Sequence, residues 1–286
     1  KKLKINYREI YSYKDLKKHK IDLFIICNPT SLHVSTLKKI AKNNANILIE
    51  KPLAFNSKSL NEAEKIYNKY KINLFTGYML RYDSRILLIK KKIKNKLKKI
   101  KYANFILQTY MPRWHPWENY KTSYASKKNL GGGVLLTCSH EIDLAVFLFG
   151  EAREIFCTYT KSFLKTNVEN SVVLVIRHRN GIVSNIILDF ASKVNQKRQF
   201  EIFFNNHSFF WDMNKSWILK KILGKNLLIK PKNKFSIDKT YYYQNKKVLS
   251  SLNSKNSRKD FKTFSHAEKV IFAAKKSFNS KKIIKI

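Results

Sequence analysis

The pattern of apolar and polar residues divides the chain near residue 80. Before that point, three short apolar runs alternate with stretches whose apolar residues recur at helical spacing. The runs span residues 21–27, 46–50 and 72–78, and helices are expected over 32–42 and 57–70, the second capped by Ser57. Nearly continuous apolar runs are typical of buried parallel strands. This part is therefore expected to be a parallel sheet with helices packed on its faces.

Beyond about residue 98 the pattern predicts a mostly antiparallel sheet. Gly131-Gly132-Gly133 introduces a helical stretch over 134–149, which Gly150 ends. Asn180-Gly181 lies between two apolar runs and is a strong hairpin signal. The expected strands of this part span residues 102–110, 153–160, 171–178, 182–191, 199–204, 208–211 and 282–286.

Two further stretches complete the fold prediction. Residues 213–262 are rich in Lys, Asn and Ser and weakly periodic, so strand fragments and surface loops are expected there. Residues 265–278 have an amphipathic pattern and predict a helix. The predicted fold class is α/β: an incomplete Rossmann-like parallel sheet over 1–80, then over 81–286 an α+β domain with a large, mostly antiparallel open sheet.

The formal net charge of +39 is the largest departure from an ordinary composition. Alone it would suggest a nucleic-acid partner, which predicts tight and steeply salt-dependent binding. However, most of the positive charges are lysines, they are spread over nearly every segment, and Asn and Ile are also abundant. An AT-rich genome would produce this composition, so we expect no nucleic-acid partner. The excess charge should still attract anionic substrates and cofactor phosphates.

Apolar runs and cysteines limit the class of protein further. No apolar run reaches the roughly 18 residues of a membrane span, and no signal segment opens the chain, so a cytoplasmic protein without a membrane partner is expected. Cys27, Cys138 and Cys157 have no paired spacing, which gives no support for a disulfide framework or a zinc site. Cys27 and Cys157 lie in apolar stretches and are expected to be small core residues.

Two motifs lie at the carboxyl ends of predicted strands, where ligands bind in open parallel sheets. The first runs from Asn28 and Pro29 to His33 at a helix start, and its simplest alternative is a helix cap. The second is Glu50-Lys51-Pro52, in which a lysine could stabilise an alkoxide-like oxygen. Its alternative is an ordinary lysine in a lysine-rich chain.

His140 is the candidate general base, since histidine titrates near neutral pH. It lies on the helical stretch after the three glycines, and Asp143, three residues later, shares its helix face and could orient the imidazole. The alternative is a histidine that only packs. Spacing places no third ligand near it, so no metal is expected.

Together these segments resemble the glucose–fructose oxidoreductase / inositol dehydrogenase (Gfo/Idh/MocA) family. The motifs NPTSLH, IEKPLA, GY with Arg81, and WHPWENYKTSYASKKNLGGGVLLTCSHEIDLAVFLFG follow in the family's order and spacing. The resemblance covers about residues 14–212 and the closing AAKKSFNSKKIIKI. The aromatic stretch and SHEID are most similar to members that act in bacterial surface-sugar biosynthesis.

The resemblance implies a sugar oxidoreductase that uses NAD or NADP. It implies that Lys51 and His140 act on the substrate hydroxyl. Many family members carry an acidic residue one turn before the histidine, where this chain has Leu136 and Thr137, so Asp143 or Glu141 would have to support His140 instead. The residues implied near the cofactor are Asn28, Pro29, His33, Glu50 and Pro52. The residues implied near the sugar are Arg81, Trp117, Tyr120 and Tyr124. It also implies a homo-oligomer, a dimer or tetramer.

The sequence departs from the family pattern at its start. None of its seven glycines forms GxGxxG, and the first three residues are Lys1, Lys2 and Leu3, without a Met. The chain is therefore expected to begin about 35 residues late in the Rossmann domain and to bind cofactor weakly. The alternative to a dehydrogenase is a non-catalytic binding or regulatory relative with the same fold.

Overall fold

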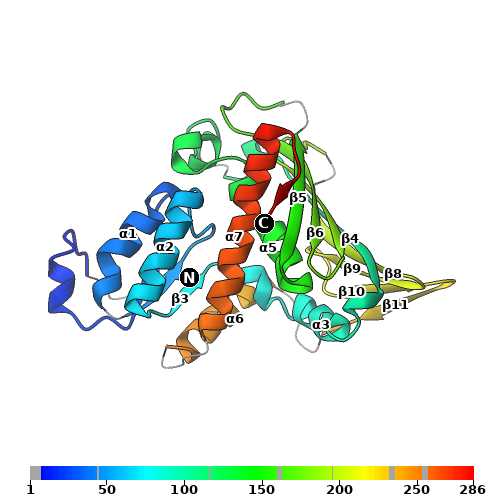
Figure 1. Cartoon of the computed structure of the whole chain (residues 1–286), viewed down its shortest axis with the longest axis horizontal. Helices are drawn as coiled ribbons and strands as arrows, with labels where there is room; N and C mark the ends of the chain where they lie inside the picture. The colour runs from blue at the N-terminus through cyan, green and yellow to red at the C-terminus, as the bar shows by residue number, and fades with distance from the viewer. Residues whose placement is uncertain are drawn as a thin grey trace.

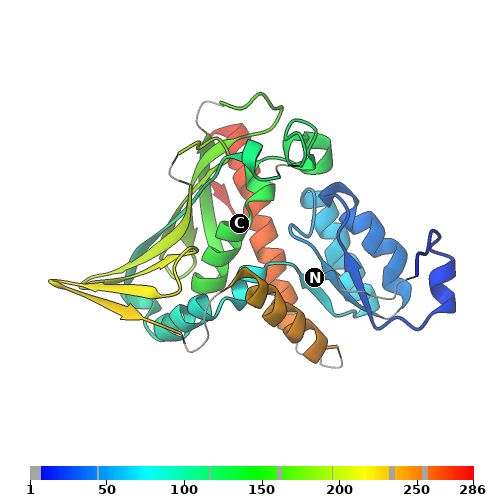
Figure 2. The same ribbon diagram turned by 180° about the vertical axis from the view of Figure 1, so that it is seen from behind.

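The structure is a computed structural model that describes residues 8–43, 45–115, 117–159, 163–194, 196–231, 236–252 and 257–286. The opening residues Lys1–Leu3 and residue 160, the last of an expected strand, lie outside this part. Within it, two sheets form, one of three strands and one of nine. The long helix α7 (Ser257–Ser280) runs between the three-stranded part and the large sheet (Figures 1 and 2).

The small sheet is parallel, as expected. Its order is β1 (Leu23–Ile26), β2 (Asn46–Ile49) and β3 (Leu74–Thr76), with α1 (His33–Ile40) and α2 (Ser57–Tyr70) between successive strands. The N-cap of α2 is Asn56 and not Ser57. Its side chain accepts from the Ser59 amide, while Ser59 Oγ accepts from the Asn56 amide.

The prediction that Cys27 is a core residue is wrong, because its side chain is exposed. Cys27 directly follows β1, which is an edge strand of the small sheet among the described residues. Ile25 on the same strand is 59% exposed, so the apolar run alone did not indicate burial here. Cys157 is buried, as expected.

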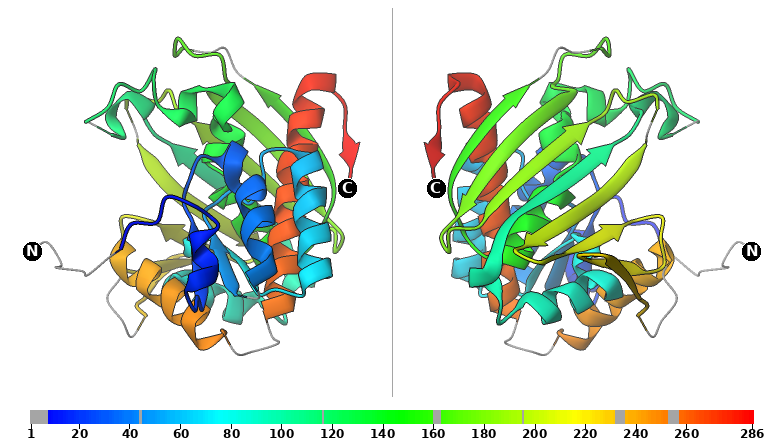
Figure 3. Two further views of the ribbon diagram at one scale, coloured as in Figure 1. Left: turned by 90° about the vertical axis from the view of Figure 1, so that its left-hand side faces the viewer. Right: turned by 90° about the vertical axis from the view of Figure 1, so that its right-hand side faces the viewer.

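The large sheet is antiparallel except where β4 pairs with β7 in parallel. Its order is β11-β10-β9-β8-β4-β7-β6-β5-β12, and Figure 3 shows its strands crossing one face of the molecule with the helices behind. On β7 buried and half-buried residues alternate, as in a sheet covered on one face. The strands are β4 (Ile100–Gln108), β5 (Ala152–Tyr159), β6 (Ser171–His178), β7 (Val183–Asp189), β8 (Lys197–Phe204), β9 (His207–Asp212), β10 (Ile218–Ile222), β11 (Lys225–Ile229) and β12 (Ile284–Lys285).

One predicted helix is divided in the structure. The stretch 134–149 is two helices, α4 (Val134–Thr137) and α5 (His140–Phe149), that break at Cys138-Ser139. The remaining helices are α3 (Ser84–Ile93) and α6 (Ile237–Ser250), and the 3-10 turns span Asp15–Lys18, Thr30–Leu32, Ala41–Asn43, Met79–Tyr82, Leu97–Lys99, Met111–Arg113, Tyr124–Ser126 and Lys128–Leu130.

No single described helix is long and apolar enough to cross a membrane. The bent pair 128–137 and 140–149 passes that test jointly, by length and composition.

The expectation of strand fragments over 213–262 is confirmed by β10 and β11, but the expectation of loops in the rest of the segment is wrong, because helices form there. This segment forms the β10–β11 hairpin, helix α6 and the start of α7. The buried positions of α6 are Thr240, Gln244 and Val248, spaced by four residues, and two of the three are polar. Because a hydrophobic pattern cannot reveal a helix that buries polar side chains, the periodicity of this segment looked weak.

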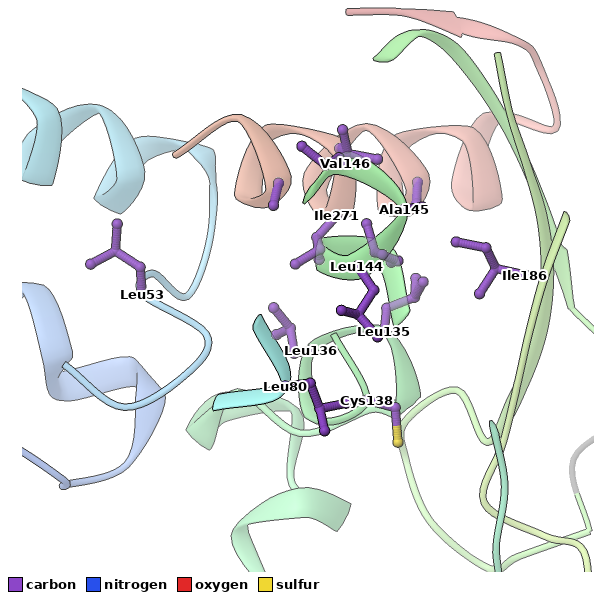
Figure 4. Close-up of a cluster of buried hydrophobic side chains, with 14 of the residues drawn as sticks. Leu53, Leu80, Leu135, Leu136, Cys138, Leu144, Ala145, Val146, Ile186 and Ile271 are labelled. Atoms are coloured by element: carbon purple, nitrogen blue, oxygen red, sulfur yellow. The ribbon is translucent and has the colours of Figure 1, made fainter. Parts of the chain in front are cut away.

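One buried apolar cluster runs through both sheets and the helices between them. Figure 4 shows Leu144 and Val146 of α5 beside Ile271 of α7, with Ile186 of the large sheet on one side and Leu53 on the other. On the far side of α7, Phe261 stacks on Tyr67 of α2, with ring centroids 3.9 Å apart. Helix α7 therefore contributes to the cores of both parts of the chain.

Candidate active site

The loops after β1 and β2 lie side by side at the carboxyl edge of the small sheet. His33 connects them, because its Nδ1 lies 2.8 Å from the Pro52 carbonyl and its Nε2 lies 2.8 Å from the Asn28 carbonyl. Burial lowers the pKa of His33, although the two carbonyls oppose this. A neutral imidazole has one N–H, so it donates to one of the two carbonyls at a time.

Lys51 extends from the second loop towards the helix pair α4–α5. Its Nζ donates to the Thr137 carbonyl at 2.7 Å, 86 positions further along the chain. The Lys51-Pro52 peptide is cis. Burial lowers the pKa of Lys51, and the positive charge of Arg198 acts in the same direction. The ammonium retains two N–H groups for a ligand.

The loop that carries Lys51 is held from the C-terminal helix. Glu268 of α7 is fully buried and accepts from the Leu53 amide at 2.9 Å and, more weakly, from the Ala54 amide at 3.5 Å. It also accepts from the Tyr78 hydroxyl at 2.6 Å. These bonds fix the Lys51 loop against the end of β3.

His140 is the first residue of α5, and only 7% of it is exposed. Its Nδ1 is buried and makes no hydrogen bond to a described residue. Burial holds the pKa of His140 well below its usual value, and the charges of Arg198 and Lys51 lower it further. The imidazole is therefore neutral at neutral pH, which is the form that accepts a proton.

Arg198, at the start of β8, crosses to α5. Its Nε lies 2.5 Å from Glu141 Oε1 and its Nη2 lies 3.1 Å from Glu141 Oε2. Both side chains are largely buried, at 16% and 3% exposure. This paired arginine stands beside His140 and is the main charged neighbour that the sequence interpretation missed. The sequence did not single out Arg198, because the chain has 58 Lys and Arg residues and nothing beside Arg198 distinguishes it from the others.

Two cavities meet at Lys51 and Tyr124, which line both. The smaller is about 260 Å³ and lies at the carboxyl edge of the small sheet. The larger, of about 450 Å³, opens between that edge, α5 and the large sheet, and His140 and Arg198 line it. Burial raises the pKa of Tyr124 to about 12, so it stays a neutral phenol. Residues of the smaller cavity are Cys27, Asn28, Pro29, Thr30, His33, Glu50, Lys51 and Tyr124.

Arg81 and Asp143 lie apart from both cavities and bind each other. Arg81 Nη2 lies 2.5 Å from Asp143 Oδ1, and Arg81 Nε donates to both carboxylate oxygens. Their side chains are 5% and 1% exposed, and the guanidinium stacks 4.0 Å from the Phe264 ring centroid. Burial raises the pKa of Asp143, while Arg81 opposes this. The Asp143 carboxylate thus faces Arg81, and the predicted roles in orienting His140 and in binding sugar have no support from this geometry.

The aromatic stretch before the three glycines divides into two groups. Tyr124 and Trp114 line the larger cavity. Trp117 is 80% exposed and stacks on His115, and Tyr120 lines a small cavity that shares Trp114 and His115 with the larger one. The structure therefore brings one of the three predicted aromatic residues to the site and adds Trp114. Tyr241 of α6 also lines the larger cavity, from a segment in which no helix was expected.

The described residues include no group of three or more His, Cys, Asp or Glu side chains arranged to hold a metal ion. The polar groups around the two cavities include ammonium groups, a guanidinium, imidazoles, amides and a carboxylate. Such groups suit a hydroxylated organic ligand with hydrogen-bonding edges.

Two family profiles match consecutive parts of the chain. The profile described as "Oxidoreductase family, NAD-binding Rossmann fold" matches residues 2–78. The profile described as "GFO/IDH/MocA C-terminal domain" matches residues 99–210. Together they cover most of the segments that form the two cavities.

Curated proteins resemble parts of the chain at 30% identity or less. A scyllo-inositol 2-dehydrogenase (NAD(+)) of Bacillus subtilis is 30% identical over 141 residues, which is 48% of this chain and 38% of that protein. The chain spans about half, or less, of the length of the curated relatives that it matches, from 35% to 53%.

Solved structures share the fold over nearly the whole chain. An inositol dehydrogenase homolog from Azotobacter vinelandii, complexed with NAD+, matches with a TM-score of 0.83 and 12% identity, over 96% of this chain and 82% of that one. The WlbA dehydrogenase from Bordetella pertussis, in complex with NADH and UDP-GlcNAcA, matches with a TM-score of 0.73 and 15% identity, over 98% and 84%.

Proposed function

Because this chain belongs to the Gfo/Idh/MocA oxidoreductase family, we propose that it transfers a hydride between a sugar ring carbon and a nicotinamide dinucleotide. The observation that carries this proposal is the meeting of two cavities at Lys51, with His140 on the wall of the larger one. The smaller cavity would hold the nicotinamide end of NAD or NADP, and the larger would hold the sugar.

The smaller cavity fits a nicotinamide and its ribose. Asn28 Oδ1 is buried there and has no hydrogen-bond partner among the described residues, so it is free to accept from an amide or a hydroxyl. Glu50 adds acceptors for ribose hydroxyls, while Pro29 and Tyr124 offer apolar surface. The cavity lies outside the carboxyl ends of parallel strands, the usual ligand position in such sheets. His33 and Pro52 would act by holding the two loops together.

In the proposed chemistry, His140 and Lys51 act on the reacting hydroxyl of the sugar. When bound, the nicotinamide ring accepts or supplies the hydride. In the direction of oxidation, the neutral imidazole of His140 takes the hydroxyl proton, and the Lys51 ammonium donates a hydrogen bond to the same oxygen. Burial, together with the charges of Arg198 and Lys51, lowers the pKa of His140 and so keeps it neutral before the reaction. The rings of Trp114 and Tyr124 present apolar faces to the C–H surface of the sugar.

The experiment is a screen of sugars and inositols with NAD and NADP, using the full chain and following nicotinamide absorbance. Lys51→Ala and His140→Ala should each lower turnover at least about 100-fold, in line with the loss of an acid–base or electrostatic group. Exposed Lys58→Ala and half-buried His207→Ala, on α2 and β9, are the matched controls. Undiminished turnover in either site variant would remove that residue from the mechanism.

A second candidate function is a binding or regulatory relative of the same fold. It predicts sugar binding without any turnover. Calorimetric titration with NAD, NADP and the same sugars measures binding. A sugar that binds but gives no change in nicotinamide absorbance would support the second candidate, and turnover would exclude it.

The finer parts of the function are also proposals. The resemblance of the aromatic stretch 114–124 to family members of surface-sugar biosynthesis supports such a role, which comparing sugar nucleotides with free inositols would test. We propose a dimer or tetramer through the outer face of the large sheet, where Tyr102, Phe156 and Val175 are exposed. Light scattering of the purified chain measures its mass directly.

The division into domains at residue 80 stays a prediction. A cytoplasmic location is also a prediction, which fractionating the source cells would test.

A further inference from the structure

The wall of the larger cavity carries charge of one sign. Lys51, Lys197 and Arg198 line it, and its described lining residues include no Asp or Glu. The smaller cavity differs, because Glu50 lies on its wall beside Lys51. The excess of positive charge is therefore a property of the larger cavity and not of the site as a whole.

Two of these three cations have no carboxylate partner. Lys51 Nζ bonds to a neutral carbonyl, and Lys197 makes no ion pair with a described residue. Arg198 is paired with Glu141 through Nε and Nη2, while its Nη1 makes no hydrogen bond to a described residue. The cavity therefore presents two ammonium groups and part of a guanidinium to the ligand that fills it.

This arrangement differs from that of the many lysines on the surface. Exposed lysines are solvated, so their charge needs no partner. Arg198 is 16% exposed, and burial lowers the pKa of Lys51, so water screens these charges poorly. Lys51 and Arg198 line the same cavity as His140, and after burial their charges are the further causes that lower the pKa of that imidazole. Positive charge held in a partly desolvated cavity is stabilised when an anion enters.

We propose that the substrate of this cavity is a sugar that carries an anionic group, a carboxylate or a phosphate, bound by Lys197 and the free edge of Arg198. This inference rests on the proposed function, because it assumes that the larger cavity holds a sugar. Lys197 and Arg198 are the first two residues of β8, so the anionic group would lie at the large-sheet side of the cavity. The reacting hydroxyl would lie at the opposite side, between Lys51 and His140.

The test compares the affinities of three related ligands for the full chain by calorimetry. The ligands are glucose, glucuronic acid and glucose 6-phosphate, and each is measured at low and at high salt. We expect at least one anionic ligand to bind 10-fold or more tightly than glucose, with a preference that weakens as salt rises. Comparing the uronic acid with the phosphate identifies which anionic group the site takes.

Variants connect the preference to the cavity. Lys197→Met should reduce the ratio of anionic to neutral affinity by about 10-fold, whereas Lys101→Met, an exposed position of β4, should leave the ratio as in the wild type. Equal affinity for glucose and both anions, or an equal effect of the two substitutions, would overturn the inference while leaving the proposed function in place. Binding of none of the three ligands would count against both.

Discussion

At the scale of single residues, strand-end positions were predictable and side-chain pairings were not. Lys51 could be placed at a ligand-binding edge because the carboxyl ends of parallel strands meet there. The spacing of Asp143 from His140 suggested a pair, since residues three apart share a helix face. In the structure Arg81, from a different segment, binds that carboxylate. Such a pairing depends on packing between distant segments, which local spacing does not encode.

The Arg81–Asp143 pair should therefore affect stability first. Asp143→Asn or Arg81→Met leaves one charge buried without its partner, which is expected to lower the free energy of unfolding by about 3–5 kcal/mol. Urea unfolding followed by circular dichroism measures this. The control is Lys38→Met, which removes an exposed ion pair with Glu62 and should change little. Unchanged stability together with lost sugar turnover would instead return Asp143 or Arg81 to the reacting groups.

At the scale of elements, strands were predicted well because their apolar runs are buried by neighbours in the sheet. The hairpin at Asn180-Gly181 is an example, since Gly181 has a φ of +88° that the turn requires. Helix α6 was missed because two of its buried positions are Thr240 and Gln244. The break between α4 and α5 was also missed, since apolar residues continue through it without interruption.

Gly133, directly before α4, is a position where an added side chain is expected to destabilise the fold. Gly133 has a φ of +103°, and a Cβ there would lie 2.4 Å from the Glu169 carboxylate, which accepts from the Leu135 amide. Gly133→Ala therefore adds a steric clash to a strained backbone. Gly150→Ala is the control, because Gly150 also has a positive φ, of +87°, but a Cβ would meet nothing within 4 Å.

We expect about 1–3 kcal/mol of destabilisation from the backbone alone in Gly150→Ala, and a larger loss in Gly133→Ala. Thermal and urea unfolding of both variants would measure the difference. Equal losses would mean that Glu169 moves aside freely and does not hold the start of α4.

At the scale of the whole molecule, helix α7 connects the two sheets. The sequence predicted a helix over 265–278 from its periodicity, but no local pattern indicated that it would pack on α2 as well as on the large sheet. That position depends on long-range contacts such as the stacking of Tyr67 on Phe261. The most consequential of these contacts is buried Glu268, which holds the Lys51 loop.

Because Glu268 is a buried carboxyl, the free energy of unfolding is expected to depend on pH. Burial raises the pKa of Glu268 from 4.5 to about 7, so the folded state holds this proton more tightly than the unfolded chain does. The stability that this proton contributes is complete below about pH 4.5 and is lost as the pH rises through about 7. At 1.36 kcal/mol per pKa unit, the loss is roughly 3 kcal/mol.

Glu268→Gln removes this titration while keeping an oxygen that can accept from Leu53 and Tyr78. Between about pH 5 and pH 8, the variant should therefore lose less stability than the wild type. Urea unfolding across this range measures it, and Glu62→Gln, whose side chain on α2 is 43% exposed, controls for the loss of one negative charge. Parallel pH profiles for wild type and Glu268→Gln would show that this carboxyl does not titrate in that range.

In the proposed function, a nicotinamide and a sugar lie side by side, with Lys51 between the two cavities that hold them. The most direct measurement is the nuclear Overhauser effect between two ligands bound together, using NADH and an alcohol-form sugar, which cannot react because both are reduced. The account predicts cross-peaks between the nicotinamide C4 protons and a sugar ring proton. Binding of both ligands without such cross-peaks would contradict it.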